Sequence, residues 1–173
     1  MVTDLDGNIY STIQIGDQIW MAENLKVTHY RDGSEIPNVT SADDWRALTS
    51  GAYCISDNNN TSGIFDTYGA LYNWSAATDT RNISPVGWHI PSDDEWKELE
   101  ITLGMSQSEA DDTGYRGTNQ GSKLAGNRSL WANGLLEDES EFGTSGFDAL
   151  PGGRRTTFTG YDEYLSIIAE FWS

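Results

Sequence analysis

Two clusters of oxygen-bearing side chains are the best candidates for chemistry in this sequence. The first cluster consists of Asp57, Asn58, Asn59, Asn60 and Asp66. The second consists of Asp4, Asp6 and Asn8, which alternate along the chain. Loop carboxylates and amide carbonyls are ligands that Ca²⁺ prefers, so we expect any bound calcium ion to lie at one of these clusters. Neither cluster has the length or the terminal glutamate of an EF-hand loop, and polar turn residues explain both clusters without a metal.

The sequence contains few residues that could form a catalytic site. A hydrolytic triad needs a nucleophile, a histidine and a carboxylate, and the chain has 2 histidines, His29 and His89. His29 lies between a threonine and a tyrosine, and His89 lies in the short Gly87–Pro91 segment, so structural hydrogen bonds explain both. The single cysteine, Cys54, excludes an internal disulfide and a cysteine-rich zinc site, and its apolar surroundings predict a small buried residue. We therefore expect a protein that is not an enzyme.

The composition predicts a single domain over residues 1–173. The chain has 37% hydrophobic and 21% charged residues and 18 glycines, which is typical of a loop-rich globular domain. Its 27 acidic and 10 basic residues give a formal net charge of -17, which repels nucleic acids and anionic lipid surfaces. No apolar stretch is long enough to span a bilayer, so we expect no membrane insertion. This charge suits a secreted or cell-surface protein.

Short elements are expected to position these residues in the first part of the chain. Alternating apolar residues on both sides of the Gly16-Asp17 turn predict a hairpin within Val2–Met21. Ser41 precedes an acidic first turn, so Ser41–Leu48 is expected to form a short capped helix. The S-x-x-E pattern and the apolar spacing after it predict a helix over Ser92–Leu103.

Other segments give weaker patterns. Gly51–Ile55 resembles a buried strand, and apolar residues three and four apart predict a helix over Thr67–Ala77. The Ser106–Ser145 segment is rich in Gly, Ser, Asn and Asp, so we expect long surface loops there. Phe147–Arg155 and Tyr164–Trp172 are expected to be late strands or extended segments.

Four ordered motifs resemble the Fibrobacter succinogenes major paralogous domain. They are Val2–Tyr10 leading to Ile19–Leu25, Tyr68–Trp74, Gly87–Trp96 and Gly146–Arg154. The resemblance implies a secreted or outer-surface bacterial protein, often a lipoprotein or one module of a larger polypeptide, with no established catalytic activity. The Gly87–Trp96 motif also resembles formylglycine-generating-enzyme-like domains, whose activity needs a pair of cysteines that this chain lacks.

Both resemblances imply an α+β fold of the C-type-lectin-like type, with a twisted antiparallel sheet, two or three short helices and long loops. The tryptophans that lie in the family motifs, and are expected in the core, are Trp20, Trp74, Trp88 and Trp96. Trp131 and Trp172 lie near loops and the chain end, where each could present a flat ring to a ligand. The lectin sugar-site signatures Glu-Pro-Asn and Trp-Asn-Asp are missing. Because the resemblance implies a surface protein, the expected partner is a protein or a glycan at the cell surface.

The chain departs from the family at its end. Relatives usually continue past Phe171–Ser173 to a last strand that carries a cysteine, and they often have a cysteine where this chain has Ser84. We therefore expect a shortened domain whose first strand, within Val2–Tyr10, keeps an open edge. The first expected function is an adhesion or structural module. The alternative is a self-assembling subunit completed by a neighbouring chain, unless Tyr164–Trp172 folds back over the edge.

Overall fold

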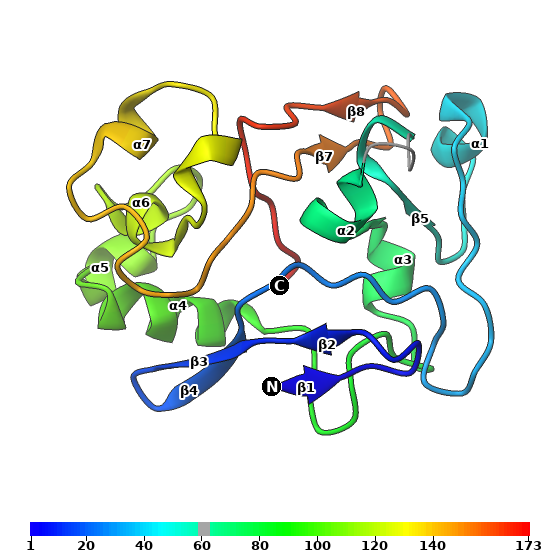
Figure 1. The fold of residues 1–173 in the computed structure, drawn as a ribbon, viewed down its shortest axis with the longest axis horizontal. Coiled ribbons are helices and arrows are strands. Elements are labelled where there is room, and N and C mark those ends of the chain that lie inside the picture. The colour runs from blue at the N-terminus through cyan, green and yellow to red at the C-terminus, as the bar shows by residue number, and fades with distance from the viewer. Residues whose placement is uncertain (59–62) are drawn as a thin grey trace.

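Short helices alternate with short antiparallel strand pairs in this computed structural model, which describes residues 1–58 and 63–173 (Figure 1). The strands are β1 Val2–Thr3, β2 Ile9–Tyr10, β3 Thr12–Ile15, β4 Gln18–Met21, β5 Tyr53–Cys54, β6 Leu71–Tyr72, β7 Arg154–Arg155 and β8 Asp162–Glu163. The α-helices are α1 Ala42–Arg46, α2 Ile64–Tyr68, α3 Trp74–Ala77, α4 Asp93–Thr102, α5 Gln107–Ala110, α6 Gln120–Leu124 and α7 Leu135–Asp138. The described 3-10 helices are η1 Ser56–Asn58 and η3 Arg128–Leu130. The expected mixture of helices and antiparallel strands is confirmed at this coarse level.

The strand pairs do not join into one ladder. In the described part of the chain, β1–β2, β3–β4, β5–β6 and β7–β8 form four separate two-stranded antiparallel sheets. The single hairpin expected within Val2–Met21 is in fact two, and the second turns at Gly16 and Asp17, where Ile15 lies opposite Gln18. Strands of two to four residues make few ladder hydrogen bonds, and helices and loops separate the later pairs. The prediction of one twisted sheet is therefore wrong for the described residues.

Side-chain caps begin two helices at the predicted places. The Ser41 hydroxyl accepts a hydrogen bond from the Asp44 N–H at the start of α1. At the start of α4, Ser92 and Glu95 form a reciprocal capping box, which satisfies backbone N–H groups that the helix leaves unpaired. The buried Leu99 then anchors α4 to the core. Both of these helix predictions are confirmed.

The single helix expected over Thr67–Ala77 is wrong, because the chain breaks at Gly69. This residue has φ 70° and ψ -154°, and a Cβ at its position would lie 2.5 Å from the carbonyl oxygen of Leu25. The chain then forms strand β6, and the Asn73 side chain caps α3 by accepting from the Ala76 N–H. Ala76 of α3 and Tyr72 of β6 pack in one apolar cluster, whereas α2 has no buried residue.

Late in the chain, the structure contains more helix and less strand than expected. Helices α5, α6 and α7 lie inside Ser106–Ser145, and Ser106 and Glu109 form a second capping box at α5. Phe147–Arg155 contributes β7, which pairs with β8. In the described residues, Tyr164–Trp172 forms a single bridge between Ala169 and Gly153, so its expected strand is largely replaced by irregular backbone.

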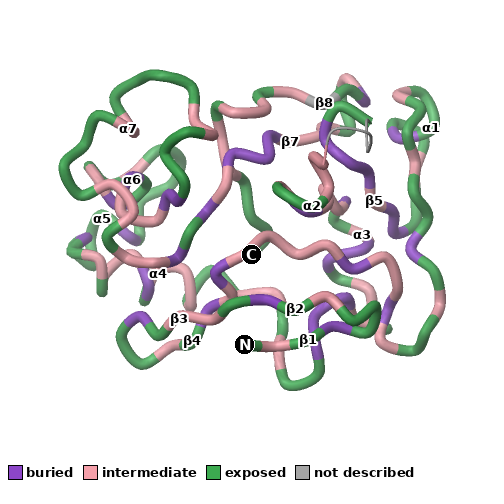
Figure 2. The backbone as a smooth tube through the Cα atoms, in the orientation of Figure 1, coloured by how far each residue is buried: buried purple, intermediate pink, exposed green. Residues whose placement is uncertain are grey.

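Three apolar clusters hold these elements together. One joins Trp20, Leu99 and Phe147, the second centres on Val27 and Tyr30, and the third contains Trp45, Ala52 and the buried Cys54. Figure 2 shows buried segments around β5 and β7, whereas the loops around α7 are largely exposed. Burial of Cys54 is as predicted.

Candidate functional site: an aromatic cavity

A cavity of about 980 Å³ gathers most of the tryptophans of the chain. Six of the seven tryptophans line it, namely Trp20, Trp45, Trp74, Trp88, Trp96 and Trp172. They come from β4, α1, α3, the segment before α4, α4 itself and the C-terminal segment. The last of these segments ends near the middle of the molecule (Figure 1). Ligand sites are commonly cavities of this size with aromatic walls.

The inner wall is a contiguous set of aromatic rings. Trp96 of α4 lies 4.9 Å from Trp20, 5.8 Å from Phe147 and 5.5 Å from Phe171, measured between ring centroids. Phe147 and Phe171 meet edge to face at 5.7 Å. Trp96 and Trp88 both line the cavity, and each is intermediate in burial.

Two tryptophans are exposed at this cavity. Trp74 is 52% exposed and Trp172 is 43% exposed, and their ring centroids lie 5.4 Å apart. The Trp172 Nε1–H donates to the Tyr72 carbonyl at 2.8 Å, which fixes its ring against β6. Trp74 was expected in the core, and this expectation is wrong. It is the first residue of α3, whose buried residues are Ala76 and Ala77.

Polar contacts position the loop that carries Trp88 and His89. The Arg31 guanidinium donates to the carbonyl oxygens of Ser84 at 2.6 Å and Pro85 at 2.5 Å, and also to that of Trp88. His89 Nε2 lies 2.8 Å from Glu95 Oε1. The Ser92 N–H is the main cause that lowers the pKa of Glu95, and His89 adds to it. His89 is thus hydrogen-bonded, as the sequence suggested.

Asp148 is a cavity residue that the sequence analysis missed. It lines the cavity between the buried Phe147 and Ala149, and its backbone has φ 55°, a conformation that is uncommon for residues with a side chain. Among the residues that the structure describes, its carboxylate has no hydrogen bond or ion pair. The available signal was a lone acidic residue inside an otherwise apolar and glycine-rich motif, Gly146–Gly153.

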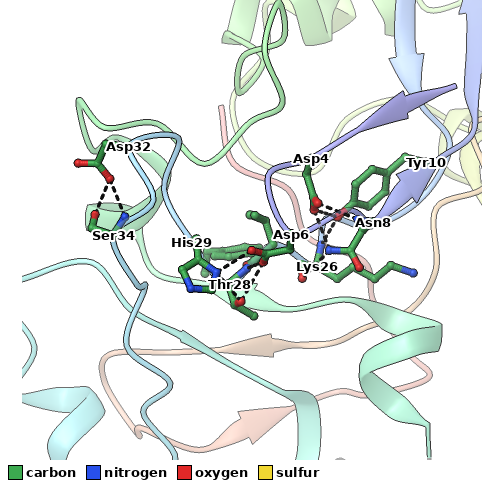
Figure 3. Close-up of polar contacts among 11 residues, drawn as sticks. Asp4, Asp6, Asn8, Tyr10, Lys26, Thr28, His29, Asp32 and Ser34 are labelled. Atoms are coloured by element: carbon green, nitrogen blue, oxygen red, sulfur yellow. Dashed lines mark hydrogen bonds and ion pairs between the residues drawn. The ribbon is translucent and has the colours of Figure 1, made fainter.

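The acidic residues Asp4 and Asp6 lie outside this cavity, in a network of hydrogen bonds (Figure 3). Asp4 is buried and accepts from the Asn8 N–H at 2.9 Å, the Asn8 side-chain amide at 2.8 Å and the Tyr10 hydroxyl at 2.6 Å. Burial, followed by the Asp4 hydrogen bond, raises the pKa of Tyr10. Asp4 therefore closes the β1–β2 turn.

Asp6 anchors the β1–β2 turn to the segment that follows Val27. Its carboxylate accepts from the Thr28 N–H at 2.5 Å and the Thr28 hydroxyl at 2.8 Å, and it contacts His29 Nδ1 at 2.6 Å. Burial raises the pKa of Asp6, but these hydrogen bonds outweigh burial and the net shift is downward. A metal ion would have to displace these donors to reach either carboxylate.

The other predicted calcium cluster, from Asp57 to Asp66, falls partly outside the described residues, because Asn59 and Asn60 lie in the 59–62 gap. Asp57 and Asp66 are both exposed. The neighbouring Asn58 is held by Arg155, whose guanidinium donates to the Asn58 side chain at 3.0 Å. Within residues 1–58 and 63–173, no group of three or more His, Cys, Asp or Glu side chains is arranged to hold a metal ion.

Trp131, the other predicted ligand-binding tryptophan, is not part of the cavity lining. It is intermediate in burial, and its Nε1–H donates to the Gly126 carbonyl at 3.0 Å. The structure thus brings Trp172 to the cavity and leaves Trp131 in a separate loop region. No helix among the described residues has the length and apolar character needed to cross a bilayer.

Fold and site together define a mixed α/β domain whose short helices and antiparallel strand pairs surround an aromatic cavity. The chain belongs to the Fibrobacter succinogenes major domain family, whose model matches residues 13–173. No curated protein and no solved structure matches this chain.

Proposed function

We propose that this chain is a non-catalytic binding module of the bacterial outer surface, built on a C-type-lectin-like fold, and that its aromatic cavity binds a protein or a glycan. One observation carries the proposal: six of the seven tryptophans line a single cavity of about 980 Å³. Exposed tryptophans offer a large contact area at low entropic cost, because the ring has few rotatable bonds. The family membership and the net charge of -17 support an extracellular location.

Two features of the titratable groups support a non-catalytic role. The carboxylate of Glu95 caps α4 and contacts His89, so it is committed to local structure. Cys54 is fully buried, which removes its thiol from contact with a substrate. Asp57 and Asp66, the residues where we expect any calcium ion, do not line the cavity.

A binding experiment tests the proposal. The protein is titrated against a glycan array and a panel of purified surface proteins. Trp74→Ala is expected to weaken binding of any hit at least tenfold, because the variant removes an exposed ring at the cavity. Tyr115→Ala is the matched control, since Tyr115 is exposed but does not line the cavity. Equal losses in the two variants would contradict the proposal.

Self-assembly is a second candidate, supported by the edge of the first hairpin. In the described residues, β1–β2 is a two-stranded sheet that joins no other strand, so backbone groups remain available at its edges. Light scattering across a concentration series, for wild type and Ile9→Pro, tests this candidate. A growing particle that disappears in the variant supports it, whereas a monomer at all concentrations for both proteins contradicts it.

A further inference from the structure

The C-terminal segment of the chain forms part of the wall of the aromatic cavity, with Ala169, Glu170, Phe171 and Trp172 among the lining residues. The Gly153 N–H donates to the Ile168 carbonyl at 3.0 Å, and the Trp96 Nε1–H donates to the Trp172 carbonyl at 3.3 Å. The Trp172 indole in turn donates to the Tyr72 carbonyl. The cavity wall therefore combines ring faces with donors that already bind backbone carbonyls of this chain, and contacts of both kinds hold extended peptides in other proteins.

The charged residues of the cavity wall are mainly acidic. They are Glu23, Glu95, Asp148, Glu170, Arg154 and Arg155, in addition to His89. Both guanidinium groups are occupied: Arg154 binds Glu163 and Glu170, and Arg155 binds the carbonyls of Thr40 and Gly160, among others. An incoming anion would therefore meet unbalanced carboxylates on a chain of net charge -17.

Asp148 is the carboxylate that stands available for a ligand. Glu95 is committed to Ser92 and His89, and one oxygen of Glu23 accepts from the Ser11 N–H at 2.7 Å. Asp148 lines the same cavity without a partner among the described residues. Asp148 is exposed, so a cationic donor of a ligand can reach its carboxylate and form a charge-assisted hydrogen bond with it.

Aromatic faces already receive guanidinium groups in this protein, and Arg154 and Arg155, which supply two of these groups, line the cavity. The pairs are Arg81 over Tyr30 at 3.8 Å, Arg128 over Phe142 at 4.4 Å, Arg155 over Trp45 at 4.8 Å and Arg154 over Tyr164 at 5.0 Å. Cation–π contacts of this kind are most favourable on tryptophan. At the cavity, Trp74 and Trp172 are exposed. Among the described residues, no cationic side chain lies over either ring, so a cation of a ligand could bind there.

We infer that the ligand of the cavity is an extended segment of a partner protein that carries an arginine or lysine side chain. The inference rests on the proposed function and narrows it from protein or glycan to a basic peptide segment. In this arrangement the aromatic wall packs against the peptide, and Asp148 pairs with its cationic group. The cavity is thus selective for positive charge.

Matched peptides test the inference. Capped five-residue peptides of alternating arginine and tryptophan are titrated into the intact chain by calorimetry, beside peptides with citrulline, which is neutral and nearly the same shape. The arginine peptide is expected to bind at least tenfold more tightly than the citrulline peptide. Asp148→Asn should remove most of this difference, whereas Asp17→Asn, which neutralises an exposed turn carboxylate outside the cavity, should leave it unchanged.

The possible results distinguish failure of the basic-peptide inference from failure of the proposed binding function. Equal affinity for both peptides on the wild-type chain overturns the inference, and this comparison does not depend on the folding of any variant. Binding of neutral glycans alone, with loss in Trp74→Ala, overturns the inference and keeps the proposed function. If neither peptides nor array glycans nor purified surface proteins bind, both fail.

Discussion

Aspartates serve two roles in this protein that a sequence pattern does not separate. Asp4 and Asp6 are turn residues, whereas Asp148 is a candidate ligand-binding residue. The alternating oxygens of Asp4 and Asp6 resemble calcium ligands, but each carboxylate accepts several hydrogen bonds from donors of the protein. Asp148 has the opposite surroundings, with apolar neighbours and no partner among the described residues. The number of satisfied acceptors, rather than the presence of a carboxylate, distinguishes a turn residue from a candidate ligand.

The pKa of the Asp79 carboxylate is lowered by Arg81 and gives a testable pH dependence. The Arg81 side chain, followed by its backbone N–H, lowers the pKa of Asp79 from 3.8 to about 2. Because the folded-state pKa is below the unfolded value, Asp79 stabilises the native state fully above about pH 4, and this contribution is lost as the pH falls toward 2. Carboxyl carbon NMR shifts should report a midpoint near pH 2.

The Arg81→Ala variant is the matched test of that prediction. It removes the donor, so the Asp79 midpoint should move up toward 3.8, while the midpoint of Asp32, which Ser34 holds down first of all, should move much less. An Asp79 midpoint that is the same in both proteins would show that Arg81 is not the cause.

A glycine position decides where one secondary-structure element ends and the next begins. Gly69 separates α2 from β6 because its backbone, with φ 70° and ψ -154°, adopts a conformation nearly restricted to glycine and lies against Leu25. Gly7 also has positive φ, 86°, but a Cβ there would meet nothing within 4 Å. Gly7 therefore tests backbone strain alone, whereas Gly69 combines backbone strain with steric contact.

Alanine at the two glycines tests this separation. Gly7→Ala is expected to cost about 1 kcal/mol, because only the left-handed backbone is penalised. Gly69→Ala should lower the free energy of unfolding by about 2–4 kcal/mol, because a backbone conformation nearly restricted to glycine is strained and the added Cβ would also displace the Leu25 backbone. Urea unfolding of both variants measures the difference. A Gly69→Ala cost no larger than that of Gly7→Ala would mean that the chain relaxes freely at this break.

A calcium ion that binds the native state would stabilise the whole molecule against unfolding. We expect any such ion at Asp57 and Asp66, because donors of the protein already fill Asp4 and Asp6. A chelator should then lower the melting temperature by a few degrees, since about 1 kcal/mol corresponds to roughly 2–4 °C at this size.

Variants locate the ion in that experiment. Asp66→Asn should abolish the effect of the chelator, and Asp17→Asn should retain it, because Asp17 is an exposed turn residue of another hairpin. A melting temperature that does not respond to chelator or to added Ca²⁺ would leave the acidic loop as ordinary surface.

Local features were predictable from the sequence because they depend on neighbouring residues. The Ser92–Glu95 capping box, the Ser41 cap and the turn at Gly16 each need only a few consecutive residues, and the structure confirms all three. The burial of Cys54 followed from its apolar neighbours. Membership of the family followed from ordered motifs that span most of the chain.

Only the tertiary structure decided which residues meet. The break at Gly69 depends on Leu25, and the exposure of Trp74 depends on how α3 turns its alanines inward. The cavity forms because strand, helix and C-terminal segments bring their rings together, and no local pattern encodes contacts between such distant positions. The sequence by itself thus determined the capped helices, the turn at Gly16 and the supply of aromatic side chains, whereas long-range packing determined the remaining elements and the cavity that these side chains enclose.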